Sequence, residues 1–214
     1  MRRLLVILLA TVFAAGIAAA QSPNDLIDEA IVELTAGLDG RRDELAENRA
    51  ALHALIDEIL LPRFDRRYAA QLVLGQHWRS ASAEQRERFV EAFYNAMLRQ
   101  YADGVLEFEP DRIEVLPFRG DDTQRRTMVR TMVMLDDGQR VPVNYGLVKR
   151  DEGWRMFDVT IEGVSYVRNF RAELDSEIRG SSLDRVIARF EREAEDSEGE
   201  SDGDSGNAGQ TAVE

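Results

Sequence analysis

The chain has 214 residues, of which 44% are hydrophobic and 31% charged, and its formal net charge is −13 at pH 7. Nucleic-acid binding requires a basic face for the phosphates, so this balance argues against it, and also against tight, purely electrostatic docking on anionic membranes. The sequence contains no cysteine, so an exported form of it has to be stabilised by its core alone.

The first 20 residues have the pattern of a secretory signal peptide. Arg2 and Arg3 form a basic n-region, residues 4–17 are almost entirely apolar, and residues 18–20 are three alanines that suit a signal peptidase. The alternative is a membrane anchor, but the apolar run is shorter than the ~20 residues that a membrane span requires. We therefore expect cleavage before Gln21 and a soluble, exported protein.

The first half of the remaining chain has apolar residues at helical spacing. Ser22 is a capping residue and Pro23 suits a first turn, so a helix is expected to start there. Further helices are expected at residues 42–61, 64–74 and 83–106. The last of them follows a capping box at residues 82–85.

The helix expected at residues 83–106 is apolar around most of its circumference. Its polar stripe is narrow and consists of Arg88, Glu91, Asn95, Arg99 and Asp103. A helix of this kind has to be surrounded by other elements or face an apolar interior. We therefore expect it at the centre of the domain.

From residue 111 onward, apolar and polar residues alternate with period two, which predicts strands at residues 113–117, 127–135, 140–149 and 154–161. Turn sequences that end in Gly138 and Gly153 connect the later strands as hairpins. Two closing helices are expected at residues 165–179 and 183–194. The predicted fold class is α+β, in which helices and a curved antiparallel sheet enclose an apolar pocket.

The end of the chain differs in composition. Residues 191–214 contain nine acids against a single arginine, and none of residues 197–207 is apolar. Such a segment cannot bury enough surface to order itself, so we expect a disordered, solubilising tail, with partner binding as the alternative. The predicted organisation is a signal peptide at residues 1–20, one folded domain at residues 21–190 and the tail at residues 191–214.

A search for catalytic and metal-binding patterns finds little. His53 and His77 fall in different elements, and neither has a partner at the spacing of a metal site, so no metal or cofactor is expected. The best acid–base candidates are Asp158 and Glu162, with Tyr145 as a hydrogen-bond donor. We favour the plainer interpretation that these carboxylates are solvated or cap a helix.

Four segments, taken together and in this order, resemble the MlaC family of periplasmic phospholipid carriers, also described as toluene-tolerance or organic-solvent-tolerance proteins. They are LPRFD at residues 61–65, LGQHW at residues 74–78, SAEQR at residues 82–86 with the helix that follows, and residues 154–171, which contain WRMFDV, EGVS and NFR. The resemblance extends from about Pro23 to Phe190.

This resemblance implies a nuclear-transport-factor-2-like sheet with added helices, and a pocket that takes phospholipid acyl chains while the head group stays outside. It also implies a non-enzymatic protein of the periplasm. Its implied partners are an inner-membrane ABC transporter complex with an MCE-type subunit and an outer-membrane lipoprotein complex. Shuttling of lipid between them would maintain the lipid asymmetry of the outer membrane.

Pattern and resemblance together suggest which residues line the pocket. The candidates come from the central helix, the strands and the start of the closing segment: Phe93, Met97, Tyr101, Val129, Val133, Val143, Tyr145, Phe157, Val159, Val164 and Tyr166. Four methionines suit either an ordinary core or the lining of an adaptable pocket, namely Met128, Met132, Met134 and Met156. Three arginines after Pro62 could meet a lipid phosphate or an acidic partner, but a solvated face is the simpler interpretation for Arg63, Arg66 and Arg67.

Two other functions stay open from the residues alone. An interaction module of the cell envelope would have a filled core with no cavity for two acyl chains. A small-molecule isomerase or dehydratase on the same fold would have an inward, desolvated carboxylate with a raised pKa.

Overall fold

A computed structural model describes residues 22–202, with side-chain environments to residue 194. The predicted signal peptide lies outside the described residues. The helices are α1 (Pro23–Leu38), α2 (Arg42–Glu47), α3 (Arg49–Leu60), α4 (Arg66–Leu74), α5 (His77–Ser80), α6 (Ala83–Leu106), α7 (Tyr166–Gly180) and α8 (Leu183–Asp202), with 3-10 turns η1 (Leu61–Arg63) and η2 (Pro110–Arg112). The strands are β1 (Ile113–Val115), β2 (Arg126–Met134), β3 (Arg140–Arg150), β4 (Gly153–Ile161) and β5 (Val164–Ser165).

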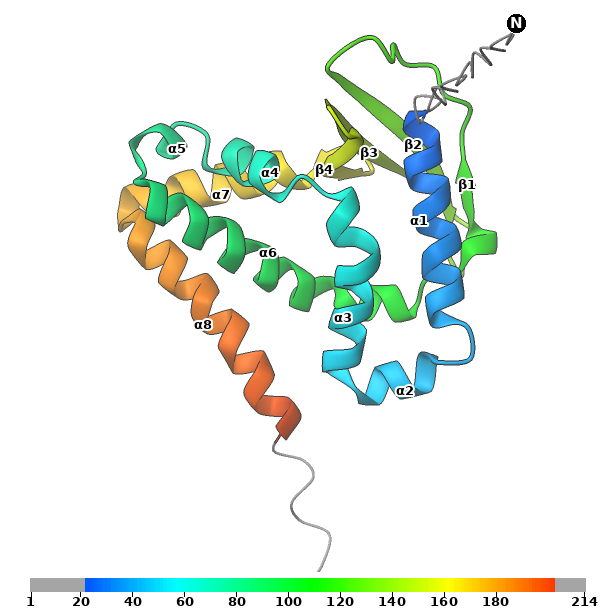
Figure 1. Cartoon of the computed structure of the whole chain (residues 1–214), viewed down its shortest axis with the longest axis horizontal. Coiled ribbons are helices and arrows are strands. Elements are labelled where there is room, and N and C mark those ends of the chain that lie inside the picture. Colours follow the sequence, from blue (N-terminus) through cyan, green and yellow to red (C-terminus); the bar gives the residue numbers. More distant parts are fainter. Residues whose placement is uncertain (1–21, 203–214) are drawn as a thin grey trace, which may run out of the picture.

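The predicted helix starts are confirmed by their caps. The Ser22 hydroxyl accepts a hydrogen bond from the Asp25 N–H, and Ser82 does the same for Gln85, each as half of a capping box. α6 crosses the middle of the molecule (Figure 1) and packs against α2, α3, α4 and α8. This agrees with the central position expected from its apolar circumference.

The helix predicted at residues 42–61 is two helices. α2 ends at Glu47, and the side chain of Asn48 accepts a hydrogen bond from the Ala51 N–H, which starts α3. Asparagine favours helix caps over helix interiors because its side chain competes for backbone groups. The short helix α5 was not predicted.

The strands form one antiparallel meander in the order β1-β2-β3-β4-β5, which confirms the α+β class. β5 was not predicted. It pairs with β4 across a two-residue turn, Glu162-Gly163, in which both residues have positive φ, 50° and 84°. This combination is the one that a tight type I′ hairpin requires.

The register of the sheet shifts between Gly146 and Leu147 of β3, where Phe157 is the extra residue on β4. Phe157 therefore leaves the alternation that the sequence predicts for it. A side chain built on Gly146 would lie 3.2 Å from both the Phe157 ring and the Asp158 side chain. Phe157 and Asp158 thus share one face of the sheet, as the two residues of a bulge commonly do.

The buried apolar residues form three separate clusters. One lies among α4, α6, α7 and α8, another among α1, α2, α3 and the end of α6, and the third between α1 and the sheet. A domain usually has one contiguous core. Here half-buried apolar side chains stand at the borders of the clusters.

α8 reaches Asp202, so it is longer than the helix expected at residues 183–194 and includes part of the predicted tail. Phe190, where the folded domain was expected to end, is only 2% exposed and packs its ring against Phe89 and Phe93. Residues 203–214 lie outside the described residues. In residues 22–202, no helix has both the length and the hydropathy of a membrane span.

Candidate functional site

One face of the sheet, here called the inner sheet face, carries most of the predicted pocket residues. Val129, Tyr145 and Val159 are directly paired across β2, β3 and β4. The next row on this face pairs Thr131, Val143 and Ile161. Directly paired residues share a face, so five of the six sheet candidates come together here: Val129, Val133, Val143, Tyr145 and Val159.

Burial differs along this face. At one end, Leu26 and Ile27 of α1 pack on it, and Val129 is fully buried. Val159, in the same row as Val129, is only half-buried, as are Val143 and Val133 in the next two rows, whereas their neighbours Thr131 and Val141 are buried. An apolar ligand laid against these half-buried side chains would bury more of their surface.

Tyr145 and Thr131 are two polar groups of the inner sheet face. The Thr131 hydroxyl donates a 2.7 Å hydrogen bond to the Val143 carbonyl, so this buried group is satisfied. Burial raises the pKa of Tyr145, opposed in part by a hydrogen bond with Thr131. Tyr145 therefore stays neutral well above physiological pH, as an apolar environment requires.

The helical candidates form a chain of aromatic rings. The Tyr101 and Tyr166 rings lie 5.6 Å apart, edge to face, and the Phe93 and Phe170 rings lie 5.3 Å apart. Tyr166 and Phe170 connect the two pairs. Met97 packs against the same cluster. Burial, with a hydrogen bond and charge interaction from Tyr166, raises the pKa of Tyr101.

Three candidate residues differ from the others in their exposure or in the sheet face on which they lie. Val164 pairs with Ile161 and so shares the inner sheet face, but it is 59% exposed. Tyr101 is 43% exposed. Phe157 lies on the opposite face and packs its ring against Tyr68 of α4, 5.2 Å away, so its expected position beside Val159 was wrong.

Ile161 shares the inner sheet face and was not among the predicted pocket residues. It pairs with Val143 on one side and Val164 on the other. Continuing the alternation of β4 from Val159 would have found it. Ile113, opposite Val133, extends the face in the same way.

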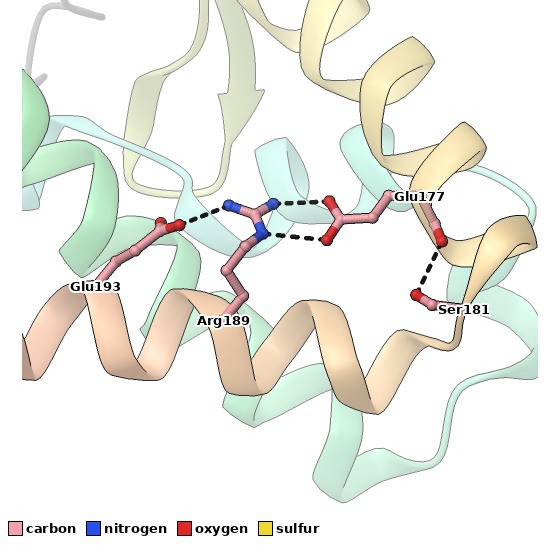
Figure 2. Close-up of polar contacts among 4 residues, drawn as sticks. All are labelled: Glu177, Ser181, Arg189 and Glu193. Carbon is pink, nitrogen blue, oxygen red and sulfur yellow. Dashed lines mark hydrogen bonds and ion pairs between the residues drawn. The ribbon is translucent and has the colours of Figure 1, made fainter.

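Three open hollows have been located among the described residues, and none includes a predicted pocket residue. The largest, about 660 Å³, lies between α7 and α8. Figure 2 shows Arg189 of α8 reaching Glu177 of α7, with its Nε and one Nη donating to the two carboxylate oxygens at 3.1 and 2.8 Å. Another Nη donates to Glu193 at 2.8 Å. Charged side chains surround this hollow, among them Glu177, Arg185, Arg189 and Arg192.

The acid–base candidates do not form a catalytic group. Asp158 accepts hydrogen bonds from the Ser165 hydroxyl, at 2.6 Å, and from the Val167 N–H, at 3.0 Å, so it caps the start of α7. Tyr145 lies on the other face of the sheet, since Asp158 pairs with Gly146. Glu162 is exposed in the turn.

The histidine of the LGQHW segment has a structural contact. His77 Nε2 lies 2.8 Å from Asp175 of α7, and the Gln76 side chain donates to the same oxygen at 2.9 Å. These hydrogen bonds, His77 first, lower the pKa of Asp175. Within the described part of the chain, no three histidine, aspartate or glutamate side chains gather as a metal site would require.

The arginines after Pro62 are engaged in ion pairs rather than free for a phosphate. Arg63 pairs with Glu33 at 2.7 Å, Arg66 with Glu91 at 3.3 Å, and Arg67 with Glu87.

The methionines that could suit either a core or a pocket differ in their burial. Met156 is buried on the inner sheet face, whereas Met128 and Met134 are exposed on the opposite face.

Comparison with known proteins gives consistent matches. The model of the family described as MlaC protein matches residues 28–192. The chain is 28% identical over 190 residues to the toluene tolerance protein of Pseudomonas putida, covering 87% of each chain. It is 21% identical over 176 residues to the intermembrane phospholipid transport system binding protein MlaC of Haemophilus influenzae, covering 81% of this chain and 82% of that one.

A solved structure shows the same fold. The phospholipid-binding protein from Ralstonia solanacearum, determined in complex with a phospholipid, superposes with a TM-score of 0.71. The match covers 83% of this chain and 97% of that chain, at 21% sequence identity.

Proposed function

The chain belongs to the MlaC family, and from this premise we propose that it is a non-enzymatic carrier that holds the acyl chains of a phospholipid and works in the periplasm. The observation that supports the proposal is that Val133, Val143, Val159 and Ile161 of the inner sheet face are only half-buried, beside the buried cluster between α1 and the sheet. The named phospholipid-binding relatives support the same ligand.

The proposed acyl-chain site lies on the inner sheet face, around Val133, Val143, Val159 and Ile161. These side chains are half-buried without a ligand, so a chain laid against them would complete their burial. The aromatic pair Tyr101 and Tyr166 stands at the more exposed end of the candidate set. We place the head group towards that end, outside the apolar site.

The energetics of a carrier follow from the hydrophobic effect. Each exposed methylene costs about 0.8 kcal/mol, so a phospholipid with roughly thirty of them is disfavoured as a monomer in water by on the order of 20 kcal/mol. A protein site that resembles the bilayer interior removes most of this cost. Uptake from a membrane is then nearly neutral in free energy, and the carrier can also unload.

A nearly neutral carrier gives no direction to transport, so direction has to come from its partners. We propose that these are an inner-membrane ABC transporter complex with its MCE-type subunit and an outer-membrane lipoprotein complex. Movement of lipid between them would serve the lipid asymmetry of the outer membrane. This chain itself makes or breaks no bond in the proposed cycle, which is consistent with the engaged carboxylate of Asp158.

Native mass spectrometry of protein purified without detergent from a bacterial periplasm tests the proposal. We expect close to one phospholipid per protein. Val143→Asp should abolish the bound lipid, because it puts a charge on the inner sheet face, and burying an unpaired charge is strongly unfavourable. The neighbouring change Asn144→Asp puts the same charge on the opposite face of the same strand and should leave the lipid in place.

A protein that is free of lipid and stays so after incubation with liposomes would overturn the proposal and favour an interaction module of the envelope. Equal loss of lipid in both aspartate variants, with both still folded by circular dichroism, would move the site away from the inner sheet face.

A further inference from the structure

The outer face of β2 alternates arginine and methionine. Because residues two apart on a strand share a face, the side chains opposite to Val129 and Val133 are Arg126, Met128, Arg130, Met132 and Met134. We call these five residues the outer sheet patch. The acyl-chain site on the inner sheet face does not use them.

The outer sheet patch is an exposed apolar surface. Met128 is 47% and Met134 46% exposed, and Leu135, which follows β2, is 42% exposed. The helix α1 packs on the other face of β2, against Val129. Exposed large apolar side chains grouped on one face, with charged residues among them, mark interaction surfaces more often than chance exposure does.

The charge of the outer sheet patch is opposite to that of the chain. Among the described residues, neither Arg126 nor Arg130 has a carboxylate within ion-pair distance, whereas the other three arginines of the strands do, namely Arg140, Arg150 and Arg155. Arg140, across from Met134, is paired with Glu114. Two unpaired guanidinium groups therefore stand on one sheet face of a chain with net charge −13.

We infer that the outer sheet patch is a docking surface for a protein partner that presents carboxylates around an apolar centre. Methionine and arginine are both enriched in protein interfaces. Methionine side chains also adapt to differently shaped partners, which suits a carrier that meets a different complex at each membrane. The inference rests on the proposed function, because a carrier has to be recognised by the complexes between which it moves.

Two other occupants fit less well. In a two-fold dimer through this face, Arg126 and Arg130 would meet arginines of the second copy, and like charges across an interface are costly. An anionic bilayer would attract the two arginines but repel the rest of a strongly acidic molecule within a Debye length of about 10 Å. A protein partner can restrict its negative charge to the contact.

The test uses two purified probes, the periplasmic part of the MCE-type subunit and the outer-membrane lipoprotein complex. For each probe, the Kd for the lipid-loaded wild-type protein is compared with the Kd for the lipid-loaded double variant Arg126→Glu/Arg130→Glu. We expect the Kd for at least one probe to rise about tenfold or more, equivalent to about 1.4 kcal/mol. Met128→Ser/Met134→Ser should weaken the same complex without a change in charge.

The matched control is Arg185→Glu/Arg192→Glu. It makes the same change in net charge at two exposed arginines of α8, which lies on the opposite side of the molecule from β2 (Figure 1). We expect it to change the Kd by less than about twofold, as surface substitutions away from a contact usually do. Equal effects of the two double variants, or no effect of Arg126→Glu/Arg130→Glu on either probe, would overturn the inference.

Vesicles containing phosphatidylglycerol distinguish a membrane from a protein partner. Binding to them that disappears in Arg126→Glu/Arg130→Glu, while both protein probes bind unchanged, would assign the patch to a lipid surface and overturn the inference. Native mass spectrometry on the same samples separates the two proposals. A failure of docking with lipid still bound contradicts only the docking surface, and absence of lipid from the wild-type protein contradicts the carrier function.

Discussion

Gly75 ends α4 in a backbone conformation that other residues avoid, with φ of 53° and ψ of −115°. A Cβ at this position would also lie 2.7 Å from the Nε of Arg171 on α7. These two residues belong to the segments LGQHW and NFR, which carried the resemblance to the family. Their contact gives a physical reason for finding both segments in one chain.

We therefore predict that Gly75→Ala lowers the free energy of unfolding by about 1–3 kcal/mol, since it adds backbone strain and displaces the Arg171 guanidinium. Urea unfolding followed by circular dichroism measures this. Gly104→Ala is the control, because Gly104 lies in α6 at negative φ with open space around its Cβ position. Alanine should stabilise that helix by about 0.5–1 kcal/mol. A loss of stability at both positions would mean that Gly75 is not special.

Single residues also explain where inference from sequence failed. The period-two rule placed Val129, Val133, Val143, Tyr145 and Val159 on one face, because each lies in a regular part of its strand. It failed at Phe157, because a bulge adds one residue there, and no glycine or proline among residues 154–161 indicates it. A bulge depends on the partner strand as well, so β4 alone could not predict it.

At the scale of elements, Asp158 connects the sheet to α7. It accepts hydrogen bonds from the Ser165 hydroxyl and the Val167 N–H, and the Ser165 hydroxyl in turn accepts one from the Arg168 N–H. The first turn of α7 is thus anchored to β4. Since Tyr166 begins that turn, this anchor also positions the aromatic end of the candidate site.

Asp158→Ala should destabilise the protein by about 1–3 kcal/mol, because it leaves the donors at the start of α7 without a partner. Thermal or urea unfolding gives the value. Glu162→Ala removes an exposed carboxylate from the nearby turn and should cost less than about 0.5 kcal/mol. If Asp158→Ala were as stable as the wild type, the capping role would be wrong and a functional role for this carboxylate would have to be reconsidered.

Elements with strong end signals were predictable from sequence. Ser22 and Ser82 begin α1 and α6 as expected, and glycine turns separate β2, β3 and β4. The break at Asn48 and the extension of α8 to Asp202 were not predicted. In α8 the contacts that hold the helix are tertiary, including the bidentate pair of Arg88 with Glu191 and the burial of Phe190. The amino-acid composition near residue 191 does not indicate these tertiary contacts, so the length of α8 could not be predicted from it.

At the scale of the whole molecule, three apolar clusters share one domain, and the inner sheet face lies at the border of one of them. The cluster among α4, α6, α7 and α8 contains the interlocked rings of Phe89, Phe93, Phe170 and Phe190, of which Phe89 and Phe190 are fully buried. The sheet cluster, in contrast, ends in half-buried valines. Without a ligand, the free energy of local unfolding should therefore be lower in the sheet than in the helical part.

Removal of bound lipid tests this division. A ligand at 100 times its Kd stabilises the native state by about 2.7 kcal/mol, and for a domain of this size each kcal/mol shifts Tm by about 2–4 °C. We expect delipidated protein to melt about 5–10 °C lower than loaded protein. Amide hydrogen exchange should accelerate most in β3 and β4, while the buried turn of α8 around Phe190 keeps its protection, because its contacts lie outside the proposed acyl-chain site. Uniform acceleration throughout the chain would show that the three clusters unfold as one unit, and unchanged exchange in β3 and β4 would place the lipid somewhere other than the inner sheet face.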